Sequence, residues 1–167
     1  MIGGADQSTE RNKKMREELE QKLADEFPFM RKNENFQTET GYVHDLYGAF
    51  GMECGDGWYD VIRGLCLDIT DIYKKRNLKV AVKPLQIKEK YGSLRFYCDI
   101  DAENDVEMDK ELLDEICNEV FEAVSKWEDV SERTCELCGK DGERRGFGWV
   151  TTRCEECHQK ALERNGE

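Results

Sequence analysis

The chain has 167 residues, which is enough for one domain and a small additional module. Hydrophobic residues make up 38% and aromatic residues 10%, so the chain can bury a core and disorder throughout is excluded. The formal net charge of −12 disfavours non-specific binding to DNA or RNA, because such binding relies on excess Lys and Arg. The first residues are polar and no apolar run is long enough to cross a bilayer, so we expect a cytoplasmic protein that is not in a membrane.

Apolar residues three and four positions apart predict three helices. The first covers residues 8–27 and ends before Pro28, which cannot continue a helix. Residues 28–54 show no clear period. The second helix covers residues 58–77 and the third residues 109–128, each with an apolar stripe along one face.

Between the second and third helices the composition becomes that of β-strands. Val80 and Val82 are expected to form a separate short strand before Pro84. Two further strands surround Tyr91-Gly92, and residues 94–100 alternate between apolar and polar side chains. The pattern therefore predicts a β-hairpin.

The alternation also determines the register of this hairpin. An even loop length places Ile87 opposite Phe96 and Leu85 opposite Cys98, so that all four share a buried face. An odd loop length would place Lys88 opposite Phe96 and disrupt that face. We therefore expect the even register.

In the even register the opposite face carries Lys88, Lys90, Arg95 and Tyr97. Three cations and an aromatic ring on one face of an acidic protein could hold a phosphate, a nucleotide or an acidic peptide. The alternative is an ordinary solvated face, on which lysines discourage pairing between sheet edges. Both interpretations remain open from the sequence.

The order helix, helix, hairpin, helix indicates an α+β fold, in which a small antiparallel sheet packs against helices. The sequence also suggests two domains. Residues 1–130 would form the helical and hairpin domain, and residues 131–167 a zinc module.

The second domain is defined by two CxxC pairs. Cys135 and Cys138 are separated by fifteen residues from Cys154 and Cys157. Two-residue spacing allows both thiolates of a pair to reach one ion, and four sulfurs complete the tetrahedron of a structural zinc site. Four protein ligands leave no position for a reactive water. We therefore expect Zn²⁺ in a structural role, with His158 as a less favoured ligand.

The other cysteines and acid–base residues form no recognisable constellation. Cys66 and Cys117 fall on apolar helix faces, where free cysteine behaves as a small hydrophobe. His44 and Asp45 are neighbours, and Asp56 is a candidate N-cap of the helix over residues 58–77. No nucleophile can be placed beside them from the sequence, so we assign no catalytic residues.

Three motifs resemble a set of small bacterial and phage proteins: GDGW at 55–58, QIKEKYGSLRFY at 86–97 and the paired CxxC motifs at 135–157. The knuckle, hairpin and helix order of the last motif also resembles a treble-clef zinc finger. No histidine lies between Cys138 and Cys154, so the nuclease activity of some treble clefs is not implied. The phage resemblance implies an interaction role, such as inhibition of a host defence by binding a protein or sequestering a signalling nucleotide.

Three functions remain as hypotheses. The first is a non-catalytic, zinc-containing binding protein for a protein or an anionic small molecule. The second is an enzyme acting on a phosphorylated substrate, with His44, Asp45 or Asp56 as the acid–base group and the hairpin cations binding phosphate. The third is a nucleic-acid-binding zinc protein, which the net charge disfavours.

Overall fold

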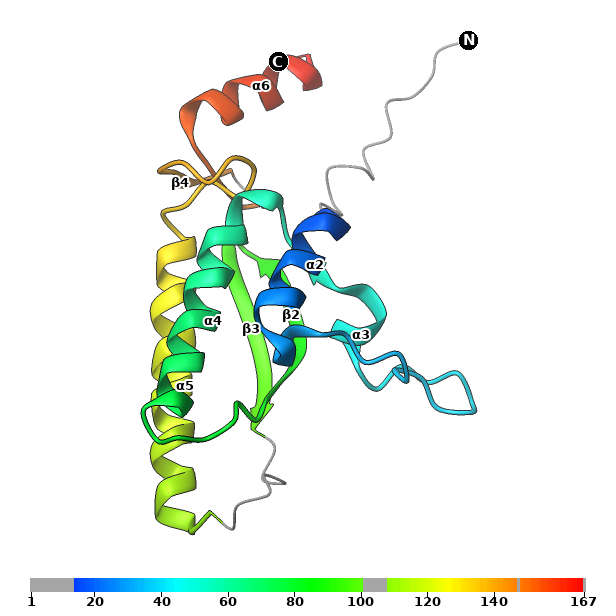
Figure 1. Cartoon of the computed structure of the whole chain (residues 1–167). Coiled ribbons are helices and arrows are strands. Elements are labelled where there is room, and N and C mark those ends of the chain that lie inside the picture. Colours follow the sequence, from blue (N-terminus) through cyan, green and yellow to red (C-terminus); the bar gives the residue numbers. More distant parts are fainter. Residues whose placement is uncertain (1–13, 101–107, 147, 167) are drawn as a thin grey trace.

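The structure is a computed structural model that describes residues 14–100, 108–146 and 148–166 (Figure 1). Its first described helix, α2, spans Glu17–Glu26, and the expected helical residues 8–13 lie outside the described part. Pro28 ends the helix as expected and begins the 3-10 turn η1, Pro28–Met30. The Asp56 carboxylate accepts the backbone N–H of Arg16 at the start of α2. Asp56 makes no cap bond to its own helix, so that prediction was wrong.

The two long helices confirm the predicted apolar stripes. After the 3-10 turn η2, Asp56–Trp58, helix α4 spans Tyr59–Lys74 and α5 spans Lys110–Ser131. Figure 1 shows the two helices side by side along one face of the sheet. The buried residues that they contribute to the core include Trp58, Val61, Ile62, Leu65, Ile69, Ile72, Tyr73, Ile116, Val120 and Val124.

The segment without a clear period contains short elements. Helix α3 spans Leu46–Phe50 and strand β1 spans Met52–Glu53. Glu20 of α2 is 4% exposed, and its carboxylate accepts the N–H of Met52 and pairs with Lys32. A buried carboxylate therefore joins α2 to the start of β1.

The predicted hairpin consists of β2, Val82–Lys90, and β3, Ser93–Ile100, which pair antiparallel. Strand β1 pairs with β2 in parallel, so the sheet order is β1-β2-β3 and the sheet is mixed. The α+β class is confirmed, but an antiparallel sheet was too narrow a description. Two residues of β1 are too few to show a strand pattern in the sequence.

The even register is confirmed where Ile87 lies opposite Phe96. The expected pair of Leu85 with Cys98 is wrong, because a bulge between Pro84 and Gln86 places Pro84 opposite Cys98. The same strand continues back to Val82, so the separate short strand before Pro84 is also wrong. Phe96 directs its N–H away from β2, and by alternation Cys98 does the same. Proline fits opposite Cys98 because no ladder donor is needed there.

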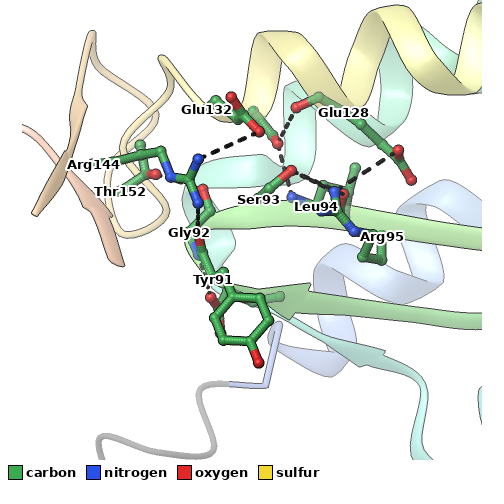
Figure 2. A network of polar contacts seen from close by, with 11 residues as sticks. Tyr91, Gly92, Ser93, Leu94, Arg95, Glu128, Glu132, Arg144 and Thr152 are labelled. Carbon is green, nitrogen blue, oxygen red and sulfur yellow. Dashed lines mark hydrogen bonds and ion pairs between the residues drawn. The ribbon is translucent and has the colours of Figure 1, made fainter. Parts of the chain in front are cut away.

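The outer edge of β3 is covered by side chains of α5. Leu94 donates its N–H to Ser131 Oγ at 2.8 Å, and Phe96 donates its N–H to Glu128 Oε1 at 3.0 Å. Figure 2 shows Leu94 of β3 and Glu128 of α5 within this network. Backbone donors that would otherwise be open to another strand are therefore satisfied within the molecule.

The C-terminal module follows α5 directly. A two-stranded sheet of β4, Glu143–Arg145, and β5, Thr151–Arg153, leads into helix α6, Glu155–Asn165. A knuckle, a hairpin and a helix in this order form the expected treble-clef arrangement. No helix in the described ranges, which omit residues 1–13, 101–107, 147 and 167, has the length and apolar character needed to cross a membrane.

Candidate functional site

The four predicted cysteine ligands converge. The Sγ atoms of Cys135, Cys138, Cys154 and Cys157 all lie within 4.8 Å of one another. The sulfurs of Cys138 and Cys154 are 3.6 Å apart. A tetrahedral zinc with Zn–S bonds of about 2.3 Å separates its sulfurs by about 3.8 Å, so the cluster has suitable dimensions for a metal ion.

Local backbone geometry produces this convergence. Gly139 follows the first pair at φ 78°, a conformation that suits glycine and turns the chain sharply after Cys138. Cys154 is the N-cap of α6, and its sulfur accepts the N–H of Cys157. The second pair therefore sits on the first turn of a helix.

Charge within the cluster also favours a cation. The N–H donated by Cys157 lowers the pKa of Cys154 to about 7. Burial raises the pKa of Cys157 to about 12, and the neighbouring Cys154 sulfur adds to this shift. Four adjacent thiolates would repel one another, and a divalent cation between them removes that repulsion.

The knuckle that carries the first cysteine pair packs against the GDGW motif. Gly57 donates its N–H to the Glu136 carbonyl at 2.8 Å, and Gly55 donates to the Glu136 carboxylate at 3.0 Å. The indole N–H of Trp58 reaches the carbonyl of Thr134 at 2.8 Å. A Cβ at Gly57 would overlap the carbonyl oxygen of Cys135. The two glycines of the motif therefore allow two backbones to approach closely.

The β4–β5 hairpin makes a second contact, with the turn between β2 and β3. Thr152 Oγ1 donates to the Gly92 carbonyl, and Arg144 donates to the Tyr91 carbonyl (Figure 2). Arg144 also lies 3.9 Å from Glu132, at the end of α5. The three motifs singled out in the sequence thus meet at one junction between the module and the rest of the chain.

The proposed ligand-binding residues share one side of the sheet, here called the outer face. Lys88 lies opposite Arg95, Tyr97 lies opposite Gln86, and Lys90 lies at the turn. The registers place four cations and two carboxylates on the outer face: Lys83, Lys88, Lys90, Arg95, Glu53 and Asp99. Leu94 and Phe96 point to the buried side, whereas Tyr97 is 44% exposed.

Arg95 differs from the lysines because its guanidinium is already engaged. Its Nη1 donates to Ser93 Oγ at 2.7 Å and to the Leu94 carbonyl at 3.1 Å, and lies 3.9 Å from Glu128 (Figure 2). Burial raises the pKa of Glu128, while the Phe96 N–H and Arg95 oppose that shift. Arg95 therefore helps to cover the edge of β3, and the lysines are the more available cations of the outer face.

Two acid–base residues of the enzyme hypothesis, Asp45 and Asp56, have separate structural roles, and the third, His44, is exposed. Asp45 is 3% exposed and caps α3 by accepting the N–H of Gly48. It lines a cavity of about 250 Å³ whose lining includes Lys83 of the outer face, but not Lys88, Lys90 or Arg95, the cations of the enzyme hypothesis. Asp56 binds both the backbone and the guanidinium of Arg16.

The dispersed cysteines are not members of the metal cluster. Cys54 and Cys66 are fully buried, and burial raises the pKa of both thiols. Cys98 and Cys117 are half-buried, and burial raises the pKa of Cys98 to about 11. A raised pKa lowers the thiolate fraction at neutral pH, so these thiols are poor nucleophiles.

Comparison with family profiles, with curated proteins and with solved structures gave no match in any of the three searches. The resemblance to bacterial and phage proteins therefore receives no support from them and stays a prediction. The candidate site depends on the convergence of the four cysteines.

Sequence reasoning missed several residues that hold the junction together. Glu136 is 8% exposed within the first CxxC pair, and both its carbonyl and its carboxylate bind the GDGW glycines. Glu128, the last residue of the predicted third helix, and Ser131, the first residue of the predicted zinc module, received no role from the sequence, but they satisfy the edge of β3. The sequence shows an acidic residue, Glu136, between the two cysteines of the first CxxC pair. It does not indicate that this residue binds the GDGW glycines.

Proposed function

We propose that this chain is a non-catalytic binding protein in which a zinc ion holds residues 131–167 as a second domain on the first, residues 1–130. The observation that carries the proposal is the convergence of four cysteine sulfurs within 4.8 Å. Four thiolates fill the coordination of zinc and leave no position for a reactive water, so the metal is structural. A module of this size buries too little apolar surface to fold alone, and metal binding supplies the missing stability.

The outer face of the sheet is the proposed binding surface. Lys88 and Lys90 lie on the side of the sheet opposite the buried Ile87 and Phe96, where Lys90 is exposed and Lys88 is half-buried. Their charges attract an anionic group from a partner in an otherwise acidic protein. Tyr97 adds an exposed aromatic ring to the same face. The ligand class is therefore an acidic polypeptide or an anionic small molecule such as a nucleotide.

The resemblance of the three motifs to small phage and bacterial proteins supports a narrower proposal. A phage-encoded inhibitor of a host defence would act in the cytoplasm by binding a defence protein or by sequestering its signalling nucleotide. Both actions require a binding face and no catalytic group, in agreement with the proposed architecture.

Three measurements test the proposal. Metal analysis of protein purified without added metal is expected to find one zinc per chain, and metal-free protein with four reactive thiols would contradict the structural site. Charge reversal at Lys88 and Lys90 is expected to remove binding of the anionic partner while the fold persists, because exposed charges change stability by less than about 0.5 kcal/mol. Incubation with candidate nucleotides, followed by denaturation, distinguishes intact recovery from enzymatic conversion.

A further inference from the structure

Tyr91 adopts a backbone conformation that a tyrosine rarely occupies. Its φ is 53°, followed by Gly92 at φ 78°, in the two-residue turn between Lys90 and Ser93. Positive φ at both turn positions strongly favours Asn-Gly, and a bulky side chain is strained there. The Tyr91 side chain is also 62% exposed, so core packing does not account for it. A strained and exposed aromatic residue supports a functional role for the ring.

The ring extends the outer face. Lys90 belongs to that face, and its ammonium lies 5.7 Å from the centroid of the Tyr91 ring. The ring therefore lies beyond the lysines, at the tip of the hairpin. An aromatic ring, two lysines and the exposed Tyr97 then follow one another along the same side of the sheet.

Two side chains of the zinc module hydrogen-bond to the backbone of this turn. Arg144 and Thr152 donate to the carbonyls of Tyr91 and Gly92 (Figure 2). A Cβ at Gly92 would lie 3.0 Å from Thr152 Oγ1 and 3.2 Å from Val150 Cγ1, so the turn and the module are closely packed.

We propose that Lys90 and Tyr91, together with Lys88 and Tyr97 of the outer face, form a docking surface for an acidic segment of a partner polypeptide, and that the zinc module sets the position of Tyr91. This inference rests on the proposed function, because it uses the same zinc site and the lysines of the outer face. Tyr is among the residue types that dominate the energy of protein interfaces. The surface lies on the first proposed domain, and the second proposed domain binds the backbone of its turn.

Charge and shape favour an acidic polypeptide as the occupant. The outer face has four cations and two carboxylates in a chain of net charge −12. The cavity beside Asp45 and a second one of about 620 Å³ beside Glu20 are lined by neither Lys90 nor Tyr91. Small ligands are usually buried in concave sites, whereas exposed rings on a sheet face suit a macromolecule. Nucleic acid has a charge at every phosphate, so the net charge of −12 repels it more strongly than a short acidic segment of a polypeptide.

The test uses a short fluorescent peptide that alternates Glu with Phe, and the same peptide with Lys replacing each Glu as its control. Tyr91→Asn supplies the residue that the turn prefers, so its melting temperature is expected to equal or exceed that of the wild type. Its affinity for the acidic peptide is expected to fall at least about tenfold. Tyr91→Phe retains the ring and is expected to bind normally. Phe121→Ala, which removes an exposed ring from α5, is the control and is expected to bind normally.

The contribution of zinc to binding is tested with the full-length chain. Removal of zinc with a chelator is expected to lower wild-type affinity to that of Tyr91→Asn, and restoring zinc is expected to recover it. If charge reversal at Lys88 and Lys90 removes binding but Tyr91→Asn does not, the docking surface is refuted and the proposed binding face stands. If neither variant changes binding, or the wild type does not bind the acidic peptide, both the docking surface and its acidic occupant are rejected. A single-stranded oligonucleotide that binds more tightly than the peptide and requires Tyr91 would overturn the choice of a polypeptide.

Discussion

Gly57 donates its backbone N–H to the carbonyl of Glu136 at 2.8 Å, and this bond joins the turn η2, just before α4, to the knuckle that carries the first cysteine pair. The sequence does not reveal this contact, because the bond joins two backbone groups and involves no side chain. The cysteine next to Glu136 is a proposed metal ligand. Metal binding and the conformation of the GDGW motif are therefore physically linked.

Loss of one ligand is expected to loosen the motif as well as the module. Cys135→Ser should release zinc and accelerate hydrogen exchange of the Gly57 amide together with residues 131–166, because metal binding is coupled to folding of the site. Cys117→Ser, which changes a half-buried cysteine on α5, is the control and should retain both metal and protection. Unchanged exchange at Gly57 in the Cys135→Ser protein would show that the knuckle does not hold the motif.

A methyl group at Gly57 is expected to weaken zinc retention without removing any ligand. The added Cβ overlaps the carbonyl of Cys135, so Gly57→Ala has to move the knuckle. We expect faster transfer of zinc to a chromogenic chelator. Gly41→Ala provides the comparison, because Gly41 has φ 80° but no atom within 4 Å of the added Cβ. It should lower stability by about 1 kcal/mol and leave zinc retention unchanged.

Truncation of two neighbouring aromatic residues tests which face of β3 is buried and which is exposed. Phe96 is 3% exposed, and Phe96→Ala should lower the free energy of unfolding by about 3–5 kcal/mol. Tyr97 is 44% exposed, and Tyr97→Ala should change it by less than about 1 kcal/mol. Equilibrium unfolding in urea measures both values. Similar losses for the two variants would contradict the assignment of the faces.

Acid is expected to remove one stabilising contribution from the contact between α4 and α5. Arg76 and Lys75 hold the pKa of Glu119 at about 2, below its ordinary value of 4.5. A carboxyl group with a lowered folded-state pKa stabilises the fold above the unfolded value, and this stability is lost as pH falls from about 4.5 to about 2.

Glu119→Gln should therefore lose stability at neutral pH but show a smaller loss than the wild type on acidification to about pH 3. Glu122→Gln changes an exposed carboxylate of the same helix and serves as the control. Protonation of the cysteines releases metal from all three proteins, so the difference between variants is the quantity to compare. An identical pH profile for the Glu119 and Glu122 variants would refute the role of this ion pair.

The elements that the sequence predicted well are those with a long, regular apolar period. Ile62, Leu65 and Ile69 of α4 are buried as their spacing indicates, and Ile87 lies opposite Phe96 as the alternation requires. The CxxC spacing predicted convergence because each pair is local. These features depend on residues that are close in the chain.

The missed features depend on distant backbone contacts. The bulge at Pro84 shifts one pairing without changing the composition of the strand. The glycines of the GDGW motif read as a helix start, whereas their main constraint comes from Cys135 and Glu136. Secondary-structure propensity indicates whether a segment can form a helix or a strand. It does not indicate which other segment will pack against that helix or strand.

The capped edge of β3 also limits how a partner can approach. Ser131 and Glu128 accept the backbone N–H groups of Leu94 and Phe96, so an incoming strand finds no free N–H donor at those two positions. Pairing between backbones depends little on sequence, but a partner cannot pair with these two occupied N–H groups. We therefore expect the partner to contact side chains on the outer face. Substitutions at such surface positions cost the fold little, so the chain could acquire a different partner while the scaffold and its metal site stay the same.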